Sequence, residues 1–527
     1  MRLFQQFRAT IARQAALGAV AFLFASGIAV SVSGQTQPAT APVQPVTVQG
    51  TPIGIEDAVR MALENNLGVQ AERLNPQIQA LGIARAQSAY TPTLFSSLLR
   101  SNSTAPPTDF NTTGEGQAIS TNGNLNAQGG LQQNLRWFGS NYQVSFTGSR
   151  ATTNNVNQVF NPQLGSGFNA QVTQPLLRNF KIDSLRQQVL TSQNNATIAD
   201  IQLQQRITQT GRNVRAAYYQ LIGAISGLEV AQQSLDVARQ SLKNNETRVE
   251  VGTMAPIDIT TAQAEVASNE EAVIVQQAAI ESAQDNLRAQ VMNPAQAGFW
   301  EARFTPSEEP SLAPRQIDVD AAIKNALQNR TDLREFKKNM ENTDIGLKFA
   351  ENQRLPAIDV TGRYGSTGVA GTRLDGETDS LLIRSYGAAL RDVFANDFRT
   401  WSFGLNVSYP IGQSTADAAY AQAKIQKQQE VTSLSQLELG ITQAVREAGR
   451  QVNTNLRRVD ATRRARELAE RRLEADNKRF SVGLATTFEL LQSQRDLSQA
   501  RQRELRAIID YNQSLVDFEA VQIAPIR

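Results

Sequence analysis

Two stretches of this chain resemble each other and decide its layout: Ile55–Asn66 (IEDAVRMALENN) and Val319–Arg330 (VDAAIKNALQNR). Each is followed, at the same distance, by a segment centred on a proline, namely Tyr90–Leu94 (YTPTL) and Arg354–Ile358 (RLPAI). Self-similarity at a fixed spacing is the sequence signature of a repeat. The sequence therefore predicts two tandem halves.

A second pair of matching segments marks the far end of each half. Val251–Thr253 (VGT) returns as Val482–Leu484 (VGL). Each half then reads as a helix, strands, a very long helix, a tight turn and a return helix. The 527 residues would ordinarily suggest three or four domains, but the repeat predicts one body made of two similar halves.

The N-terminal segment resembles a secretory signal. Arg2, Arg8 and Arg13 precede an apolar stretch at 15–32, and small residues follow near Gly34. This pattern predicts a signal peptide at 1–34, with a retained membrane anchor as the alternative. The proline-rich segment 35–53 is predicted to be a flexible linker.

Composition excludes several classes of site. The chain has no Cys and no His, which removes zinc sites built on those residues and His-dependent catalytic triads. Lys and Arg number 51 against 49 Asp and Glu, so no global charge favours nucleic acid. No carboxylate pair stands in a recognisable catalytic setting. We expect no enzyme activity, no cofactor, no resident metal and no nucleic-acid partner. After the signal, no stretch is long and apolar enough for a transmembrane helix.

Alternating strands are predicted at about 93–176 and about 357–411. The clearest is Trp401–Tyr409, where aromatic and aliphatic residues alternate with small or polar ones. Such a strand suits a wall between lipid and a wet lumen, and it suits a half-buried soluble sandwich equally well. Segments 101–129, 150–166 and 364–399, rich in Asn, Gly, Ser and Thr, are predicted to be loops. The first half is longer in its strand region, which predicts one additional hairpin near 131–149.

The helices follow from proline placement and periodicity. Pro92 ends a helix predicted at 55–90, and a corresponding helix is predicted at about 318–353. The stretch from about Leu185 to Arg248 has no proline and carries apolar residues at alternating spacings of three and four, which is a coiled-coil seam. A helix of that length is roughly 100 Å long. We predict its return at 257–291, and a second pair at 415–480 and 487–520.

The predicted organisation divides the chain into six segments, which follow in order: signal 1–34; linker 35–53; first repeat 54–292, with strands about 93–176 and a helical hairpin about 181–292 whose tip is 251–256; equatorial linker 293–316; second repeat 317–522, with strands about 357–411 and a hairpin about 415–520 whose tip is 481–486; and a C-terminal tail 523–527.

In these features the chain resembles the TolC-like outer-membrane efflux protein family, from about Ile53 to Gln522. The resemblance rests on the doubled helix starts and prolines above, on the strand-to-helix junctions QPLL at 174–177 and YPI at 409–411, and on the tips RVEVGT at 248–253 and RFSVGL at 479–484. These motifs stand in the same order in both halves.

The resemblance implies an α+β fold: an outer-membrane β-barrel shared between protomers, and a long antiparallel coiled-coil α-helical barrel, built from two tandem structural repeats. It implies a homotrimer in which each protomer supplies four strands to a twelve-stranded barrel. The location is then the outer membrane, in contact with its lipid, with a long periplasmic extension. The implied partners are a periplasmic adaptor (membrane fusion protein) and an inner-membrane pump.

The resemblance also implies a periplasmic gate. Glu489 matches an acidic entrance position of the second hairpin, and Asp258 is its counterpart in the first. A ring of Glu489 carboxylates would bind cations; the alternative is a solvated carboxylate that complements the helix dipole. Where some relatives have a second acidic residue, this chain has Gln492. Where some have a Tyr and an Arg beside the turn, it has Phe480 and Ala485, so closure would rest on apolar packing of Phe480 and Leu484.

The tips are the expected docking site for the adaptor. The residues of this chain that are predicted to contact the adaptor are Val251, Gly252, Thr253, Val482, Gly483 and Leu484. An exposed apolar turn invites a partner; alternatively, Gly252 and Gly483 are only turn glycines.

The resulting function hypothesis is a passive exit duct for a tripartite efflux system or for type I secretion. The alternative is a periplasmic coiled-coil scaffold or adaptor with a soluble β-domain. The sequence names no exported substrate.

Overall fold

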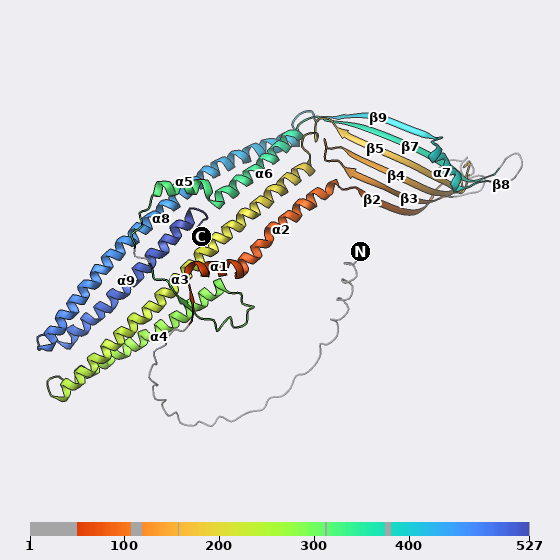
Figure 1. The fold of residues 1–527 in the computed structure, drawn as a ribbon. Helices are drawn as coiled ribbons and strands as arrows, with labels where there is room; N and C mark the ends of the chain where they lie inside the picture. The colour runs from red at the N-terminus through yellow and green to blue at the C-terminus, as the bar shows by residue number, and fades with distance from the viewer. Residues whose placement is uncertain (1–49, 107–118, 156–157, 311–312, 375–380, 526–527) are drawn as a thin grey trace, which may run out of the picture. The chain divides into compact units, whose positions relative to one another are not determined.

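The computed structural model describes residues 50–106, 119–155, 158–310, 313–374 and 381–525 (Figure 1). The predicted signal 1–34 and most of the predicted linker 35–53 lie outside these ranges, as does part of the predicted loop 101–129. None of the helices in the described ranges combines the length and apolar composition needed to cross a membrane.

The first half of the described chain contains these elements in order: β1 (Thr51–Ile53), α1 (Ile55–Asn65), α2 (Leu67–Gln87), a 3-10 turn η1 (Ser88–Tyr90), β2 (Thr93–Ala105), β3 (Ser120–Asn134), β4 (Asn141–Thr153), β5 (Gln163–Pro175), α3 (Ser184–Glu250) and α4 (Ile257–Val291). The second half contains β6 (Phe304–Pro306), α5 (Val319–Asn329), α6 (Thr331–Gln353), β7 (Ala357–Leu374), β8 (Leu381–Arg384), α7 (Tyr386–Ala395), β9 (Arg399–Ser408), α8 (Thr415–Ser481) and α9 (Thr487–Val521).

The long helices are confirmed. Helices α3 and α8 are 67 residues each, and their return helices α4 and α9 are 35 residues each. At 1.5 Å per residue, α3 is about 100 Å long. Each long helix begins at a side-chain cap, because Asp183 accepts from the Arg186 N–H and Ser414 accepts from the Asp417 N–H. Each forms an antiparallel hairpin with its return helix, and the two hairpins lie side by side (Figure 1).

The prediction of single helices at 55–90 and 318–353 was wrong. The first is divided at Asn66, whose side chain accepts from the N–H groups of Gly68 and Val69 and so starts a new helix. The second is divided at Arg330, whose backbone is extended. The buried Arg330 side chain pairs with Asp332 at 2.7 Å and donates to the Val521 carbonyl at 2.9 Å. Both breaks therefore depend on side-chain hydrogen bonds rather than on proline.

Two buried tyrosines attach β1 and the equatorial linker to the helical hairpins. Tyr218 in α3 donates to the Ile53 carbonyl at 3.0 Å, and burial raises the pKa of its hydroxyl. Tyr511 in α9 donates to the Ala313 carbonyl at 3.0 Å. Residues 51–53 form β1, which pairs in parallel with β6. The prediction that the flexible linker extends to residue 53 was therefore wrong at its end.

The remaining strands form one sheet in the order β2-β3-β4-β5-β7, with β8 and β9 both paired to β7. The predicted loops 101–129, 150–166 and 364–399 were largely wrong, because parts of β2 to β5, the end of β7, β8 and α7 lie in them. Strand β3 reads STNGNLNAQGGLQQN. Its few apolar side chains hide the alternation, and its backbone pairing with both neighbours makes it a strand.

One face of this sheet is apolar and the other is polar. In successive strands Leu94 pairs with Leu131, Leu131 with Val144, and Val144 with Ala170. On the opposite face the row runs through Gln132, Gln143 and Gln171. Because neighbouring residues of a strand point to opposite faces, this register keeps the two faces distinct across the sheet.

Helix α7 covers part of the apolar face. The Ser166 hydroxyl donates to the Ala389 carbonyl at 2.8 Å, and the Ser366 hydroxyl donates to the Val393 carbonyl at 3.0 Å. Gly368 lies so close that a Cβ there would sit 2.0 Å from the Ala389 oxygen. Small residues on β5 and β7 therefore make room for this helix.

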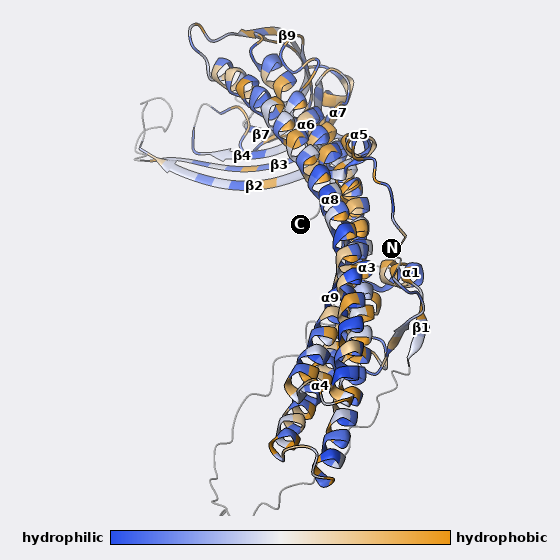
Figure 2. Ribbon diagram, turned by 90° about the vertical axis from the view of Figure 1, so that its left-hand side faces the viewer, coloured by the Kyte–Doolittle hydropathy of each residue, from blue (hydrophilic) through white to orange (hydrophobic). Residues whose placement is uncertain are grey.

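The hairpin helices have no continuous apolar surface. Polar and apolar residues alternate along each helix in Figure 2, and their buried residues face neighbouring helices. One of these clusters lies where α5, α6, α8 and α9 meet, and it includes Leu333, Ile441, Val445 and Tyr511. This packing holds α5, α6 and α9 against α8, and the turn residues 251–256 and 482–486 at the tips are mostly exposed.

Candidate functional site: the two hairpin tips

The two tips have the same backbone geometry. Gly252 and Gly483 adopt φ of 75° and 77°, the left-handed region that glycine tolerates best. Thr253 donates its N–H to the Arg248 carbonyl at 2.9 Å, and Leu484 donates its N–H to the Arg479 carbonyl at 2.8 Å. These bonds satisfy carbonyls that the ends of α3 and α8 leave free, so both turns are helix C-caps.

The tips carry exposed apolar side chains. Val251, Val482 and Leu484 are 66%, 69% and 70% exposed. Ile257 and Phe488, at the starts of the return helices, are exposed to a similar degree. Sequence reasoning missed these last two, although they follow the tip motifs directly. Apolar groups of this kind at the ends of both hairpins are available for contact with another molecule.

Glu489 and Asp258 both lie in the first turn of a return helix, as predicted. Glu489 completes a capping box: its carboxylate accepts from the Thr486 N–H at 3.0 Å, and its own N–H donates to the Thr486 hydroxyl at 3.2 Å. Its side chain is nevertheless exposed. The structure therefore gives Glu489 a helix-capping role, and an additional role at an entrance stays a prediction.

Gln492 donates to Asp496 at 2.9 Å, and Asp496 pairs with Arg472 at 3.0 Å. The acidic group that follows Glu489 in α9 is thus Asp496, and it is neutralised by an arginine of α8. Among the described residues, no group of three or more Asp or Glu side chains lies close enough together to hold a metal ion.

Phe480 makes a contact that links the two hairpins. It is buried, and the Arg248 guanidinium lies 4.5 Å from the centre of its ring. Arg248 also donates to the Phe480 carbonyl at 3.3 Å. Leu484, by contrast, is mostly exposed, so the buried ring is covered by an arginine of the other hairpin. Such a cation–π contact is worth about 0.5–2 kcal/mol.

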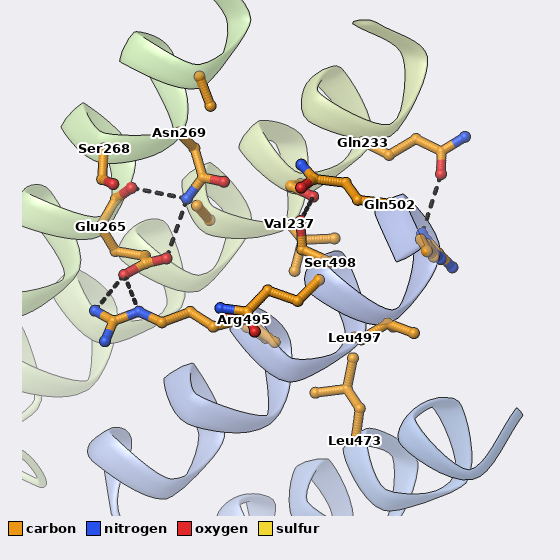
Figure 3. Close-up of a pocket in the computed structure, with 16 residues that line it drawn as sticks. Gln233, Val237, Glu265, Ser268, Asn269, Leu473, Arg495, Leu497, Ser498 and Gln502 are labelled. Atoms are coloured by element: carbon orange, nitrogen blue, oxygen red, sulfur yellow. Dashed lines mark hydrogen bonds and ion pairs between the residues drawn. The ribbon is translucent and has the colours of Figure 1, made fainter. Parts of the chain in front are cut away.

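A partly buried ion pair joins the hairpins further along the helices. Arg495 of α9 donates from Nε and Nη2 to one oxygen of Glu265 in α4, at 2.8 and 2.5 Å (Figure 3). Asn269 donates to the other Glu265 oxygen at 3.1 Å. The hydrogen bond to Glu265 raises the pKa of Arg495 above its ordinary value.

Two polar contacts continue this line. Ser234 donates to Ser498 at 3.0 Å, and Arg501 donates to Gln233 at 3.0 Å. We call these pairs, together with Arg248–Phe480 and Glu265–Arg495, the inter-hairpin contacts. Sequence reasoning missed all four as pairs, because nothing in the periodicity of one helix states which residue of another helix it meets.

Space remains between the hairpins near the tips. A cavity of about 610 Å³ lies between α3, α8 and α9, and Arg248, Phe480 and Gln494 are among its lining residues. The hairpins are therefore joined there by a few polar contacts and not by a continuous apolar core.

The two tips differ in one buried polar position. Asn245 of α3 is fully buried, and neither polar atom of its side chain has a hydrogen-bond partner. At the matching place in α8, the buried Asp476 accepts from the Ser493 hydroxyl at 2.6 Å and pairs with Arg479 at 3.3 Å. A buried amide without partners costs about 1–3 kcal/mol, so the first tip carries a penalty that the second does not.

Comparison with known proteins gives a consistent result. The family model described as outer membrane efflux protein matches residues 141–291 and 322–521. Outer membrane protein TolC of Escherichia coli (strain K12) is 23% identical over 361 residues, which is 66% of this chain and 68% of that protein. Nodulation protein T of Rhizobium leguminosarum bv. trifolii is 23% identical over 56% of this chain and 58% of that protein.

Solved structures show the same fold at low identity. The Campylobacter jejuni CmeC outer membrane channel aligns with a TM-score of 0.63 at 14% identity, covering 89% of this chain and 85% of that one. The open state of the Neisseria gonorrhoeae MtrE outer membrane channel aligns with a TM-score of 0.60 at 15% identity, covering 89% of both chains. With the family match spanning more than half of its residues, the chain belongs to the outer membrane efflux protein family.

Proposed function

We propose that this protein is the outer-membrane exit duct of a tripartite efflux or type I secretion system. In this role the protein catalyses no reaction. An inner-membrane pump drives substrate through a periplasmic adaptor, and the duct passes it to the outside. The single observation that carries the proposal is the paired arrangement of two long hairpins with exposed tips at one end and a two-faced sheet at the other end of α3 and α8.

The membrane part of the proposal rests on the sheet. Trp401, Phe403 and Leu405 are 76%, 71% and 59% exposed on one face of β9, while Ser402 and Gly404 lie on the other. An apolar face toward lipid and a polar face toward water is the pattern of an outer-membrane wall. We therefore propose a β-barrel shared between copies, a homotrimer, and the tandem repeats 54–292 and 317–522 as the two parts of each protomer.

The tips are proposed as both gate and docking site. Val251, Gly252 and Thr253 of the first hairpin and the segment 482–484 of the second would contact the adaptor, and Ile257 and Phe488 would extend that surface. Opening would move the hairpins apart, so the inter-hairpin contacts would oppose it. A ring of Glu489 side chains from several copies would form the cation-binding entrance, with Asp258 and Gln492 nearby.

The test is electrical. The mature chain is expressed, extracted from the outer-membrane fraction in detergent and inserted in planar bilayers. We expect discrete current steps that a trivalent cation blocks from one side. The same cation should not block the steps of Glu489→Ala. Block that survives Glu489→Ala would remove the proposed entrance ring. A chain that fractionates with soluble periplasmic proteins and gives no current would overturn the duct itself.

A further inference from the structure

The hairpin β3–β4 is an additional pair of strands in the first half, as the sequence predicted, although it is longer than 131–149. Strand β2 pairs with β3 along its whole length, and β4 pairs with β5 over eleven positions, from Asn141↔Thr173 to Ala151↔Gln163. The hairpin therefore stands between β2 and β5 as part of the sheet.

The turn of this hairpin is held against the sheet-to-helix junction. Phe138 stacks on Phe180 with ring centres 4.7 Å apart, and the Arg136 guanidinium lies 5.7 Å from the Tyr90 ring centre. The Gln174 amide donates to the Phe138 carbonyl at 3.1 Å. These contacts join residues 136–138 to η1 and to the end of β5 with the segment that follows it, so the hairpin is fixed at its base.

The faces of the hairpin continue those of its neighbours. Leu131 and Val144 extend the apolar face, and Phe146 pairs with Phe168 across β4 and β5. On the other face Gln128 stands between Ser97 and Thr147. A hairpin folded outside the wall would not need an apolar face that continues the apolar face of β2 and β5.

The sheet ends in two edges. In the described part of the chain, β2 pairs only with β3, and β9 pairs only with β7. Both edge strands are long, with 13 and 10 residues, and both carry exposed apolar side chains on the same face, such as Leu98 and Phe403. Unpaired backbone groups next to an apolar face must find partners when the face enters lipid.

A second copy of this chain supplies the matching edge. From β2 to β9 the sheet has six long strands, each antiparallel to the next. An even number of alternating strands places β9 of one copy antiparallel to β2 of the next. The edges are different strands of one chain, so the contact repeats head to tail and can close into a ring.

We propose that each copy contributes six strands to the shared wall, with the β3–β4 hairpin included and β2 of one copy paired to β9 of the next. This inference rests on the proposed function, since it concerns the wall of the duct. Three copies would give eighteen strands. With strands about 4.8 Å apart and tilted by about 40°, the backbone radius becomes about 18 Å, against about 12 Å for twelve strands. The wall would enclose roughly twice the cross-section.

The absence of cysteine in the chain makes cross-linking the direct test. Ser97→Cys with Gln128→Cys tests the β2–β3 pairing within one copy, and Gln143→Cys with Gln171→Cys tests β4–β5 in the same way. Both pairs should oxidise to disulfides within one chain of the detergent-extracted oligomer. The competing arrangement, with β2 directly on β5, is tested by combining Ser97→Cys with Asn169→Cys, which share the polar face; a disulfide between them would overturn the proposal.

Pairing between copies is detected as a ladder of disulfide-linked species, in which chains are joined covalently into dimers and trimers. Ser97→Cys is combined in turn with Thr400→Cys, Ser402→Cys or Asn406→Cys, which share the polar face of β9. At least one combination should give covalent dimers and a trimer, with no larger species. The matched control is Thr147→Cys with Ser402→Cys; because β4 is interior, this pair should give no ladder.

The outcomes separate this inference from the proposed function. A ladder from the Thr147 control, or the Ser97–Asn169 disulfide, in a preparation that still forms channels would reject the six-stranded wall and keep the duct. No ladder from any β2–β9 combination in such a preparation would also reject it. If the unsubstituted chain forms neither channels nor detergent-stable oligomers, the proposed function is rejected instead.

Discussion

The ion pair between Glu265 and Arg495 gives the sharpest prediction about the proposed gate. Removing the arginine leaves Glu265, a 7% exposed residue, with only the Asn269 amide as a donor from a side chain. Breaking a fully buried pair costs about 3–5 kcal/mol. The Arg495 side chain is 47% exposed, so water screens the pair and the cost is smaller. We expect Arg495→Ala to weaken the closed arrangement by about 1–2 kcal/mol, which is roughly a 5- to 30-fold change in the ratio of open to closed.

The assay is the open probability of single channels in planar bilayers. Arg503→Ala is the matched control, because Arg503 is an exposed arginine of the same helix whose side chain donates to Gln499 within α9. Glu265→Gln should have a smaller effect than Arg495→Ala, because it leaves no buried charge. The double variant should lie closer to the unsubstituted chain than Arg495→Ala does.

Two results would refute this reasoning. The first is an open probability for Arg495→Ala equal to that of Arg503→Ala. The second is strict additivity of the Glu265→Gln and Arg495→Ala effects, because residues in direct contact should couple.

Three further predictions address the tips and the junction between sheet and helices. Phe480→Leu keeps an apolar side chain but removes the ring under Arg248, so open probability should rise about 2- to 5-fold, as expected for a loss of about 0.5–1 kcal/mol; no change would show that the contact carries no energy. Asn245→Leu removes the unpartnered buried amide and should raise the melting temperature of the purified oligomer, whereas Asp476→Leu, at the matching but bonded position, should lower it; the opposite order would contradict the assignment. Hydrogen bonds from Ser414 and then Arg354 lower the pKa of Asp417, so its contribution to stability is present above pH about 4 and is lost as pH falls through the lowered pKa; Asp417→Asn should remove that part of the acid dependence of thermal unfolding, and an unchanged pH profile would disprove it.

Much of the fold could be predicted because its signals are local. The proline-free, periodic segment from about 185 to 248 could only be a long helix, and α3 ends within two residues of the prediction. The turns at Gly252 and Gly483 followed from the glycine between two helical stretches. The breaks at Asn66 and Arg330 were missed, since the Asn66 cap and the bonds of the Arg330 side chain to Asp332 and Val521 interrupt a helix without changing its apolar pattern.

The strands were predicted only where large apolar residues alternate. Trp401–Tyr409 was clear, whereas β3 has two leucines among glycine and amide residues and was assigned partly to a loop. Backbone pairing with both neighbours, and not side-chain pattern, fixes that strand. Sequence spacing did locate the extra hairpin, because the two halves differ in length at that point.

In the candidate site, too, some residues could be predicted from the sequence and others could not. The tip residues from Val251 to Thr253 and from Val482 to Leu484 could be named from the doubled motif. The partners Arg248 and Arg495 could not, because their contacts join different hairpins far apart in the sequence. Such residues come together through the packing of the two hairpins, in which α3 lies against α9.

The proposed duct is best tested by the single-channel current of the detergent-extracted chain, recorded beside that of Arg248→Ala combined with Arg495→Ala. Discrete steps of equal size are expected from both, with the double variant open for a larger fraction of the time. Steps that are absent from both, or an open fraction that does not change, would contradict a duct whose tips are held by contacts between its two hairpins.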